Sequence, residues 1–304
     1  MLPEFYKVLK KALVVLVLCI VFDILFGLLY KSFYMNQGPS RFNKMIYGDS
    51  GGNKEEIIIL GDSRAEHHYN SGLISEKTGK SVYNYGSDGQ SIFFNYAVLR
   101  KLLDSYVPEK VIYEISLSEL EFSEDTYDRL LYFLPMQNKY ANKLLKEQLG
   151  SGKLIISKLF NAYKYNSTAF IILKSYLSPK EYIAGYQPLS DELDESLFNG
   201  EPTEIVDRKA DYMIDSMKIK YFEEILQLSK EFNFKIEFFI SPTLLHTEND
   251  ILFNAINNSL SKFNYSANIF INDSSYKSSS FADIIHLNEK GADHYTNKII
   301  TLLN

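Results

Sequence analysis

The feature that most restricts this 304-residue chain is a long apolar segment near its N-terminus. From Ala12 to Tyr30 the sequence reads ALVVLVLCIVFDILFGLLY, which is apolar except at Asp23 and Gly27. A helix of this length, rising ~1.5 Å per residue, roughly matches the ~30 Å hydrocarbon core of a bilayer. We therefore expect a transmembrane anchor at 12–30, preceded by a short cytoplasmic tail at 1–11.

A cleaved signal peptide is the main alternative for such a segment. Signal peptides end in a small-x-small cleavage site, and the residues Tyr30-Lys31-Ser32-Phe33 do not provide one. A lipoprotein signal also fits poorly, because Leu18 precedes Cys19 where a small residue is expected. Both observations favour an uncleaved anchor.

The charges around the segment predict its orientation. The nearest basic residues are Lys7, Lys10 and Lys11 before it and Lys31, Arg41 and Lys44 after it. The tighter cluster on the N-terminal side favours a cytoplasmic N-terminus and a C-terminal domain on the extracytoplasmic side. Because an acidic residue inside a bilayer is costly, Asp23 is expected to face a partner or a polar cavity, unless a protonated carboxyl is tolerated in a single span.

The overall composition is that of a globular protein, with 46% hydrophobic and 23% charged residues. Its 32 Lys and Arg against 38 Asp and Glu give a net charge of -6 without a basic run, which argues against nucleic-acid binding. The single cysteine, Cys19, excludes an intrachain disulfide and a multi-thiolate metal site. No residue spacing indicates a metal site, and we expect no cofactor.

After a polar, turn-rich stalk at 31–54, the pattern becomes that of an α/β domain at 55–304. Short apolar runs typical of buried parallel strands lie at Glu56–Leu60, Ser81–Tyr85, Lys110–Ile115, Phe234–Ile240 and Ala267–Ile271. Helical patterns lie at Ser91–Asp104, Asp207–Phe232, Asn249–Phe263 and Asn288–Leu303. Alternating strands and helices predict a three-layer α/β fold with a mainly parallel sheet.

The alternation is interrupted between residues 121 and 206. This stretch has helical patterns at Asp125–Leu149 and Lys153–Leu177 and many aromatic residues, but no clear strand. We expect an inserted helical cap over the strand ends, where α/β enzymes often build substrate specificity. A purely structural insertion is the alternative.

Two short motifs carry the candidate chemistry. Gly61-Asp62-Ser63 directly follows the first predicted strand, where a serine sits near helix N–H groups that stabilise a developing alkoxide. A second copy, Gly48-Asp49-Ser50, lies in the stalk without a strand before it and is set aside. Near the C-terminus, Asp283 and His286 stand three apart before a helix, so the carboxylate can orient the imidazole for proton transfer from serine.

Together these motifs resemble the SGNH (GDSL) hydrolase family over roughly residues 55–120 and 230–304. The resemblance implies a flavodoxin-like fold, with Ser63 as nucleophile, His286 as base and Asp283 as its orienting residue. The family's second block matches Val82-Tyr83-Asn84-Tyr85-Gly86-Ser87-Asp88-Gly89. By spacing from Asn84, Gly89 corresponds to the oxyanion glycine, with Gly86 as the alternative.

The third block departs from the family pattern. Where the family has Gly-x-Asn-Asp, this chain reads Ser116-Leu117-Ser118-Glu119 after its strand, so Ser118 stands nearest the oxyanion asparagine. Loss of such a donor can cost about 2.7–4 kcal/mol in the transition state. Arg64, next to the nucleophile, is expected either to grip substrate or to form a surface ion pair.

This departure and the N-terminal span are similar to the membrane-anchored branch of the family that modifies cell-surface polymers, including DltD-like and alginate-acetylation-type proteins. The resemblance therefore implies a serine esterase or O-acyltransferase acting on acylated cell-surface carbohydrate. The alternative is a non-catalytic accessory protein that binds a glycan or a membrane acyltransferase partner.

Overall fold

The computed structural model describes residues 2–36, 54–136, 138–178, 181–194, 213–244, 250–271 and 273–303. These residues form two compact units. Unit 1 comprises the described parts of Met1–Ile46 and Leu130–Pro179, and unit 2 those of Tyr47–Arg129 and Lys180–Asn304. The second Gly-Asp-Ser copy, the stalk from 37 to 53 and the insertion from 195 to 206 lie outside the described residues.

Unit 2 is built on a five-stranded parallel sheet. Its strands are β1 (Ile57–Leu60), β2 (Val82–Asn84), β3 (Lys110–Glu114), β4 (Lys235–Ile240) and β5 (Ala267–Ile269). The strand order is β2-β1-β3-β4-β5, and every neighbouring pair is parallel. This is the flavodoxin-like order of a doubly wound sheet. The predicted α/β class and the five predicted strands are confirmed.

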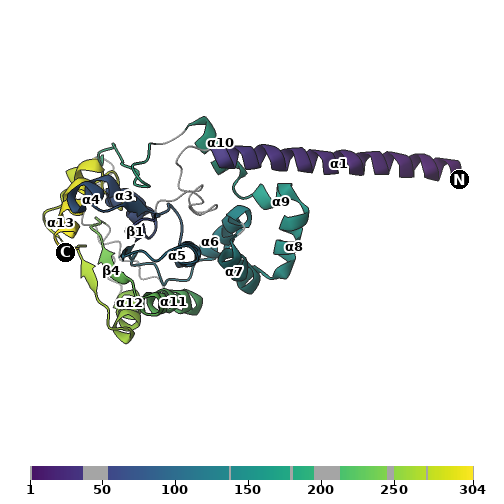
Figure 1. The fold of residues 1–304 in the computed structure, drawn as a ribbon. Coiled ribbons are helices and arrows are strands. Elements are labelled where there is room, and N and C mark those ends of the chain that lie inside the picture. The colour runs from purple at the N-terminus through teal and green to yellow at the C-terminus, as the bar shows by residue number, and fades with distance from the viewer. Residues whose placement is uncertain are drawn as a thin grey trace. The chain divides into compact units, whose positions relative to one another are not determined.

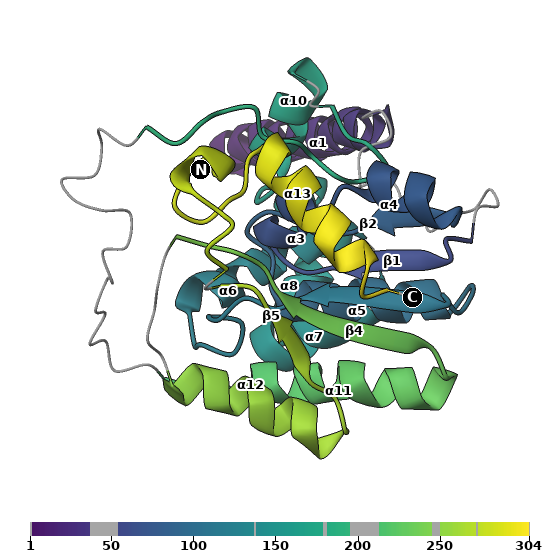
Figure 2. The same cartoon turned by 90° about the vertical axis from the view of Figure 1, so that its left-hand side faces the viewer.

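Helices cover both faces of this sheet (Figure 2). One layer holds α3 (Ser63–His68), α4 (Ser71–Thr78) and α13 (Glu289–Ile300), and the other holds α5 (Ile92–Leu103), α11 (Ser216–Phe232) and α12 (Asp250–Lys262). Because both faces are covered, β1 and β3 are buried at every residue, which explains their continuous apolar sequences. The short α6 (Glu124–Asp128) and the 3-10 helix η3 (Ser278–Ser280) lie in connections.

The helix expected from Asp207 is shorter than its sequence pattern. Helix α11 begins at Ser216, because the Asp215 side chain accepts hydrogen bonds from the N–H groups of Met217 and Lys218 and caps the helix there. Residues 207–212 lie outside the described residues. The other helices predicted for unit 2 end within a few residues of their expected limits.

Unit 1 contains the long apolar helix α1 (Leu2–Asn36) and the helices of the insertion (Figure 1). Helix α1 is long and apolar enough to cross a bilayer from Glu4 to Tyr34. It continues beyond the expected limit at Tyr30, so the first residues assigned to the stalk are helical.

The insertion consists of more and shorter helices than the two expected from the sequence. They are η1 (Arg129–Met136), α7 (Lys139–Leu149), α8 (Ser151–Leu159), α9 (Asn161–Tyr165) and α10 (Ala169–Leu177). Pro135 lies inside the 3-10 helix, and Gly150, at φ +81°, ends α7. Helices α9 and α10 pack against α1 within unit 1. A cap over the strand ends stays a prediction.

Candidate active site

The turn that presents Ser63 requires a glycine before it. Gly61 has φ +146°, and a Cβ there would lie 2.7 Å from the Ala65 Cβ and 2.9 Å from the Glu114 Cβ. After this turn, the Asp62 side chain accepts a hydrogen bond of 2.9 Å from the Arg64 N–H and caps α3. Ser63 is therefore the first residue of α3, directly after β1.

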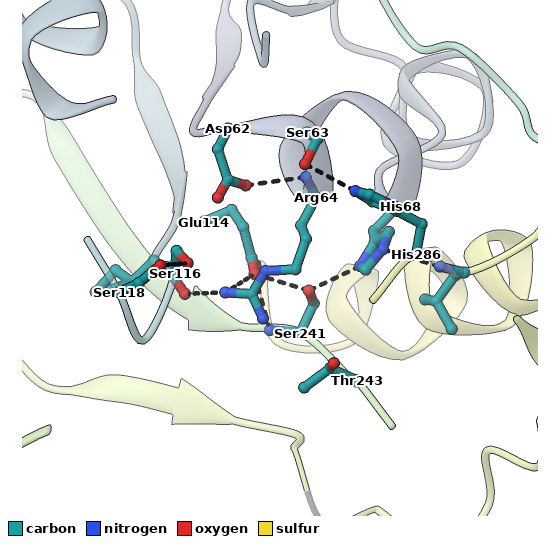
Figure 3. A network of polar contacts seen from close by, with 12 residues as sticks. Asp62, Ser63, Arg64, His68, Glu114, Ser116, Ser118, Ser241, Thr243 and His286 are labelled. Atoms are coloured by element: carbon teal, nitrogen blue, oxygen red, sulfur yellow. Dashed lines mark hydrogen bonds and ion pairs between the residues drawn. The ribbon is translucent and has the colours of Figure 1, made fainter. Parts of the chain in front are cut away.

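Ser63, His286 and Asp283 form one hydrogen-bonded chain, although more than 200 positions separate Ser63 from the other two. The Ser63 Oγ lies 2.8 Å from His286 Nε2 (Figure 3). On the other side of the ring, His286 Nδ1 lies 2.8 Å from Asp283 Oδ2. The structure thus brings together the three residues singled out from the sequence. Their order is that of a nucleophile, a base and an orienting carboxylate.

Electrostatics fix the direction of these two hydrogen bonds. Burial by itself raises the pKa of Asp283, but the hydrogen bonds from His286 and the Ile285 N–H lower the pKa to about 2. Asp283 is therefore ionised near neutral pH and can only accept, so neutral His286 carries its proton on Nδ1. The free lone pair on Nε2 then faces the hydroxyl of Ser63.

The loop that carries His286 is held at several points. Asp283 Oδ1 accepts hydrogen bonds of 2.8 Å from the N–H groups of Ile285 and His286. The next residue, Leu287, is buried, and its N–H donates to His68 Nε2 at 3.0 Å. Asn288 then caps α13. These contacts limit where the imidazole can move.

A second hydrogen-bonded chain lies beneath the first (Figure 3). The Arg64 guanidinium contacts Glu114 Oε1 at 3.1 Å and donates to the Ile115 carbonyl at 2.5 Å. The same Glu114 oxygen accepts from the Ser241 hydroxyl at 2.7 Å, and Ser241 Oγ lies 2.7 Å from His68 Nδ1. This inner chain ends at His68, whose other nitrogen holds Leu287.

Burial and charge set the protonation of this inner chain. Burial lowers the pKa of His68 well below its usual value, and the positive charge of Arg64 lowers it further. His68 is therefore neutral, as its acceptance of the Leu287 N–H requires. Burial raises the pKa of Glu114, while Arg64 and the hydrogen bonds from Tyr69 and Ser241 act in the opposite direction.

Arg64 does not reach the surface, because its side chain points into the protein toward Glu114. It is 4% exposed, so its ion pair with Glu114 is buried, where the sequence alternative was a surface ion pair. His67 is also buried, with Nδ1 2.8 Å from the Gln187 carbonyl oxygen. Its ring lies edge-on to that of His286, with centroids 5.4 Å apart.

The candidate oxyanion donors lie on separate connections. Gly89 has φ +66°, and its carbonyl accepts from Arg129 Nη1 at 2.8 Å. Within the described residues, neither the Ser63 nor the Gly89 backbone N–H donates to a protein acceptor. The Ser118 hydroxyl is exposed and lies 3.0 Å from that of Ser116. Gly86 packs against α3, because a Cβ there would lie 2.5 Å from the Glu66 nitrogen.

A cavity of about 360 Å³ is lined in part by Asp62, the residue before the candidate nucleophile. Polar side chains form most of its wall, namely those of Asp62, Gln90, Ser116, Ser118, Glu119 and Lys218, with Phe122 beside them. Burial and the charge of Asp62 raise the pKa of Glu119 to about 8, although Lys218 acts against them. Glu119 is therefore mainly protonated at neutral pH and can donate a hydrogen bond.

Glu114 and Ser241 belong to this site although no sequence motif indicated them, and His68, one turn beyond Ser63, was a candidate only for a substrate contact. The available signal was Glu114 itself, a charged residue inside the apolar strand pattern VIYEI. A carboxylate in a fully buried parallel strand needs a charged or hydrogen-bonding partner. That partner, Arg64, follows the nucleophile directly in the sequence.

No protein-family model matches the chain, and neither does any curated protein. Solved structures that match the chain include an acetyl xylan esterase, at 12% identity over 82% of this chain and 100% of that one, with a TM-score of 0.40. A protein described as a platelet activating factor from Streptococcus pneumonia matches at 11% identity over 97% and 99%, with a TM-score of 0.41. A protein described as an acylhydrolase from Bacteroides fragilis matches at 10% identity over 88% and 98%, with a TM-score of 0.40. Likenesses at these identities and TM-scores identify neither an activity nor a substrate for this chain.

Proposed function

We propose that this chain is a membrane-anchored serine esterase or O-acyltransferase that acts on acyl esters of cell-surface carbohydrate. The observation that carries the proposal is the pair of 2.8 Å hydrogen bonds linking Ser63 to His286 and His286 to Asp283. The motifs that supply these residues are also those that resemble the SGNH family. A serine activated by an oriented imidazole is suited to acyl transfer.

In the proposed reaction, Ser63 Oγ attacks the acyl carbonyl while His286 Nε2 accepts the serine proton. The ionised Asp283 stabilises the resulting imidazolium. The backbone N–H groups of Ser63 and Gly89 are the candidate donors to the oxyanion, with Ser118 as a third candidate. The imidazolium then protonates the leaving alcohol as its bond to the acyl carbon breaks, leaving an acyl-serine.

The second half of the reaction decides between the two activities. His286 removes a proton from the acceptor hydroxyl, which attacks the acyl-serine and regenerates Ser63. Water as the acceptor gives a carboxylic acid, and a sugar hydroxyl gives a new ester. The polar cavity beside Asp62 supports a hydroxyl-rich ligand, because its wall offers acceptors such as Gln90 and donors such as protonated Glu119.

Helix α1 supports the membrane part of the proposal. Its candidate span, Glu4–Tyr34, contains a strongly apolar stretch, and three lysines precede that stretch on its N-terminal side. We propose that it anchors unit 2 on the extracytoplasmic side, where cell-surface polymers are found. An export-dependent phosphatase fused after Asn304 should then be active, and a well-expressed but silent fusion would contradict this orientation.

A fluorophosphonate probe tests the catalytic proposal on the full chain in detergent. The wild type should be labelled and Ser63→Ala should not, while the control Ser50→Ala, in the second Gly-Asp-Ser copy, should label like wild type. Turnover of p-nitrophenyl acetate with and without a sugar acceptor then separates hydrolysis from transfer, because transfer adds the mass of an acetyl group to the sugar.

The altered third block, with Ser118 in place of asparagine, favours a second candidate function. This is a non-catalytic accessory protein that binds a glycan or a membrane acyltransferase. Wild-type protein that resists the probe and turns over no acyl donor would support this function and contradict the enzyme.

A further inference from the structure

The helices of unit 1 expose an unusual concentration of large apolar side chains. Over residues 151–177, which we call the helical platform, these are Ile155, Ile156, Leu159, Phe160, Phe170, Ile171, Tyr176 and Leu177. Leu159 is 67% exposed and Phe170 is 76% exposed. Single exposed apolar residues are common in soluble proteins, but a concentration of this kind indicates a surface that is covered by something.

The helical platform is attached to α1 through Asp23. The Asp23 carboxylate accepts hydrogen bonds from the N–H groups of Asn161 at 2.9 Å and Ala162 at 2.7 Å, at the beginning of α9. It also accepts from the Asn161 side chain at 3.2 Å. One turn further along α1, a Cβ on Gly27 would lie 2.3 Å from the Asn161 Cγ, so the two helices touch closely. The acidic residue in the apolar segment therefore has its partner within the same chain.

The position of Asp23 places the platform at a defined depth. Asp23 lies seven residues before Tyr30, the end of the apolar segment, which corresponds to about 10 Å along a helix. Helices that lie in a membrane interface bury their apolar face by roughly 5–10 Å. The junction of α8 and α9, with Leu159 and Phe160, lies beside Asp23 and therefore matches that depth.

Aromatic contacts support the same level for the interface. Tyr30 lies 6.1 Å from Tyr165 and Phe33 lies 4.6 Å from Tyr176, measured between ring centroids. Aromatic residues of membrane proteins gather at the level of the headgroups. In this unit they link the end of the apolar segment to α9 and α10.

Charge distinguishes a bilayer from a protein as the covering surface. Residues 139–178 contain seven lysines and one glutamate, whereas the rest of the chain has 25 basic and 37 acidic residues. Within this region, Lys158 and Lys164 line a cavity of about 520 Å³ with Asn142 and Asn161. Lysines beside exposed apolar side chains are typical of helices that bind anionic lipid.

We propose that the helical platform lies in the membrane interface beside α1, with its apolar side chains among the acyl chains and its lysines at anionic headgroups. The inference rests on the proposed membrane span of α1. It does not depend on catalysis, so probe labelling of Ser63 tests the two ideas separately.

The sequence contains no tryptophan, so one introduced tryptophan reports on one position. We would place the full chain in vesicles with brominated lipids and compare Phe160→Trp and Phe170→Trp with two references. Leu16→Trp reports on the α1 span, and Val107→Trp is a control in unit 2, where Val107 is 47% exposed. The platform tryptophans should lose roughly half of their fluorescence to bromines near the headgroups. Leu16→Trp should respond most to deeper bromines, and Val107→Trp should not respond.

Quenching at Leu16 without quenching at Phe160 or Phe170 would overturn the proposal and indicate that a protein or solvent covers the platform. Absence of quenching at all four positions would contradict both the membrane span of α1 and the membrane contact of the platform.

The contact between the platform lysines and anionic headgroups is tested separately, in the Phe160→Trp variant. Combining Lys158→Gln with Lys164→Gln should reduce the gain in quenching that anionic lipid produces, whereas Lys77→Gln with Lys101→Gln in unit 2 should not. If anionic lipid still produces the same gain in quenching after Lys158→Gln and Lys164→Gln, the proposed headgroup contact is wrong.

Discussion

Two hydrogen-bonded chains start on α3 and reach adjacent residues of the same loop, yet they differ in almost every physical property. The outer chain consists of Ser63, His286 and Asp283, and the inner chain of Arg64, Glu114, Ser241, His68 and the Leu287 N–H. The Asp283 side chain in the outer chain is 54% exposed. Every residue of the inner chain is buried.

The difference indicates separate roles for neighbouring residues. The outer chain is partly exposed at Ser63 and His286, where an acyl group and a proton enter and leave in the proposed reaction. The inner chain has no such access. Its carboxylate, Glu114, accepts hydrogen bonds from the hydroxyls of Tyr69 and Ser241, and its cation, Arg64, donates one to the Ile115 carbonyl. Removing two charges from water is costly unless such partners are present. We infer that the inner chain positions the loop that the outer chain uses.

The largest expected effect is on the outer chain. Ser63→Ala and His286→Ala should each reduce kcat on the order of 10⁶-fold, because nucleophile and base act as one unit. Neither change should lower the melting temperature appreciably, since no buried charge loses its partner. Calorimetry alongside steady-state kinetics checks this. A large loss of stability in Ser63→Ala would mean that the two chains are not separate in role.

Asp283→Ala should reduce kcat less, on the order of 10⁴-fold, since His286 can still accept a proton when poorly oriented. The pKa of Asp283 is about 2, below its unfolded value, so its stabilising contribution is present above pH ~3.8 and is lost as the pH falls through about 2. Acid unfolding of wild type and Asp283→Ala should therefore converge near pH 2. Curves that stay equally far apart down to that pH would contradict the assignment.

Glu114→Gln should affect mainly stability, because it leaves the Arg64 charge buried without its partner. Breaking a buried pair in this way typically costs about 3–5 kcal/mol. At a temperature where the variant is folded, kcat should fall by much less than in Asp283→Ala. The double change Arg64→Met with Glu114→Gln removes both charges and should recover part of the stability. If it is no more stable than Glu114→Gln in denaturant titrations, the buried charge is not the cause.

Much of unit 2 could be predicted from the sequence. The apolar runs of β1 and β3 are continuous because helices cover both faces of the sheet, so their composition alone identifies buried parallel strands. Ser63 and the Asp283–His286 pair stand at sequence positions with distinct local patterns, a strand followed by a glycine turn and a loop before a helix. Such local patterns can be recognised in the sequence without knowledge of tertiary contacts.

The inner chain and the insertion left weaker signals. Glu114 and Ser241 are 127 positions apart, and their contact depends on β3 and β4 being neighbours in the sheet. In the insertion, the predicted helix Asp125–Leu149 continues across Pro135, but the backbone does not, because proline removes a helical donor. The break at Gly150 agrees with the gap between the two predicted helices. The second predicted helix, Lys153–Leu177, is interrupted at Phe160, whose backbone is extended. The pairing of Asp23 with the start of α9 likewise has no local pattern.

The smallest effect is expected at Glu119, a buried carboxyl that belongs to neither chain and lines the cavity beside Asp62. Burial and Asp62 raise its pKa in the folded protein from 4.5 to about 8, so between these values the folded state holds a proton that the unfolded state has released. Stability should therefore fall as the pH rises through that window and level off above about 8. Glu119→Gln cannot ionise, so its melting temperature should fall less between pH 5 and pH 8 than that of wild type. Each kcal/mol of stability corresponds to ~2–4 °C in melting temperature for a domain of this size.

Two buried carboxyls can then be compared. Glu114 has Arg64 as its partner and Glu119 lacks an equally close cation, so their variants show how a cationic partner changes the stability of a buried carboxyl. Parallel melting curves for wild type and Glu119→Gln across this pH range would show that Glu119 is ionised in the folded protein and would remove it as a donor to the ligand.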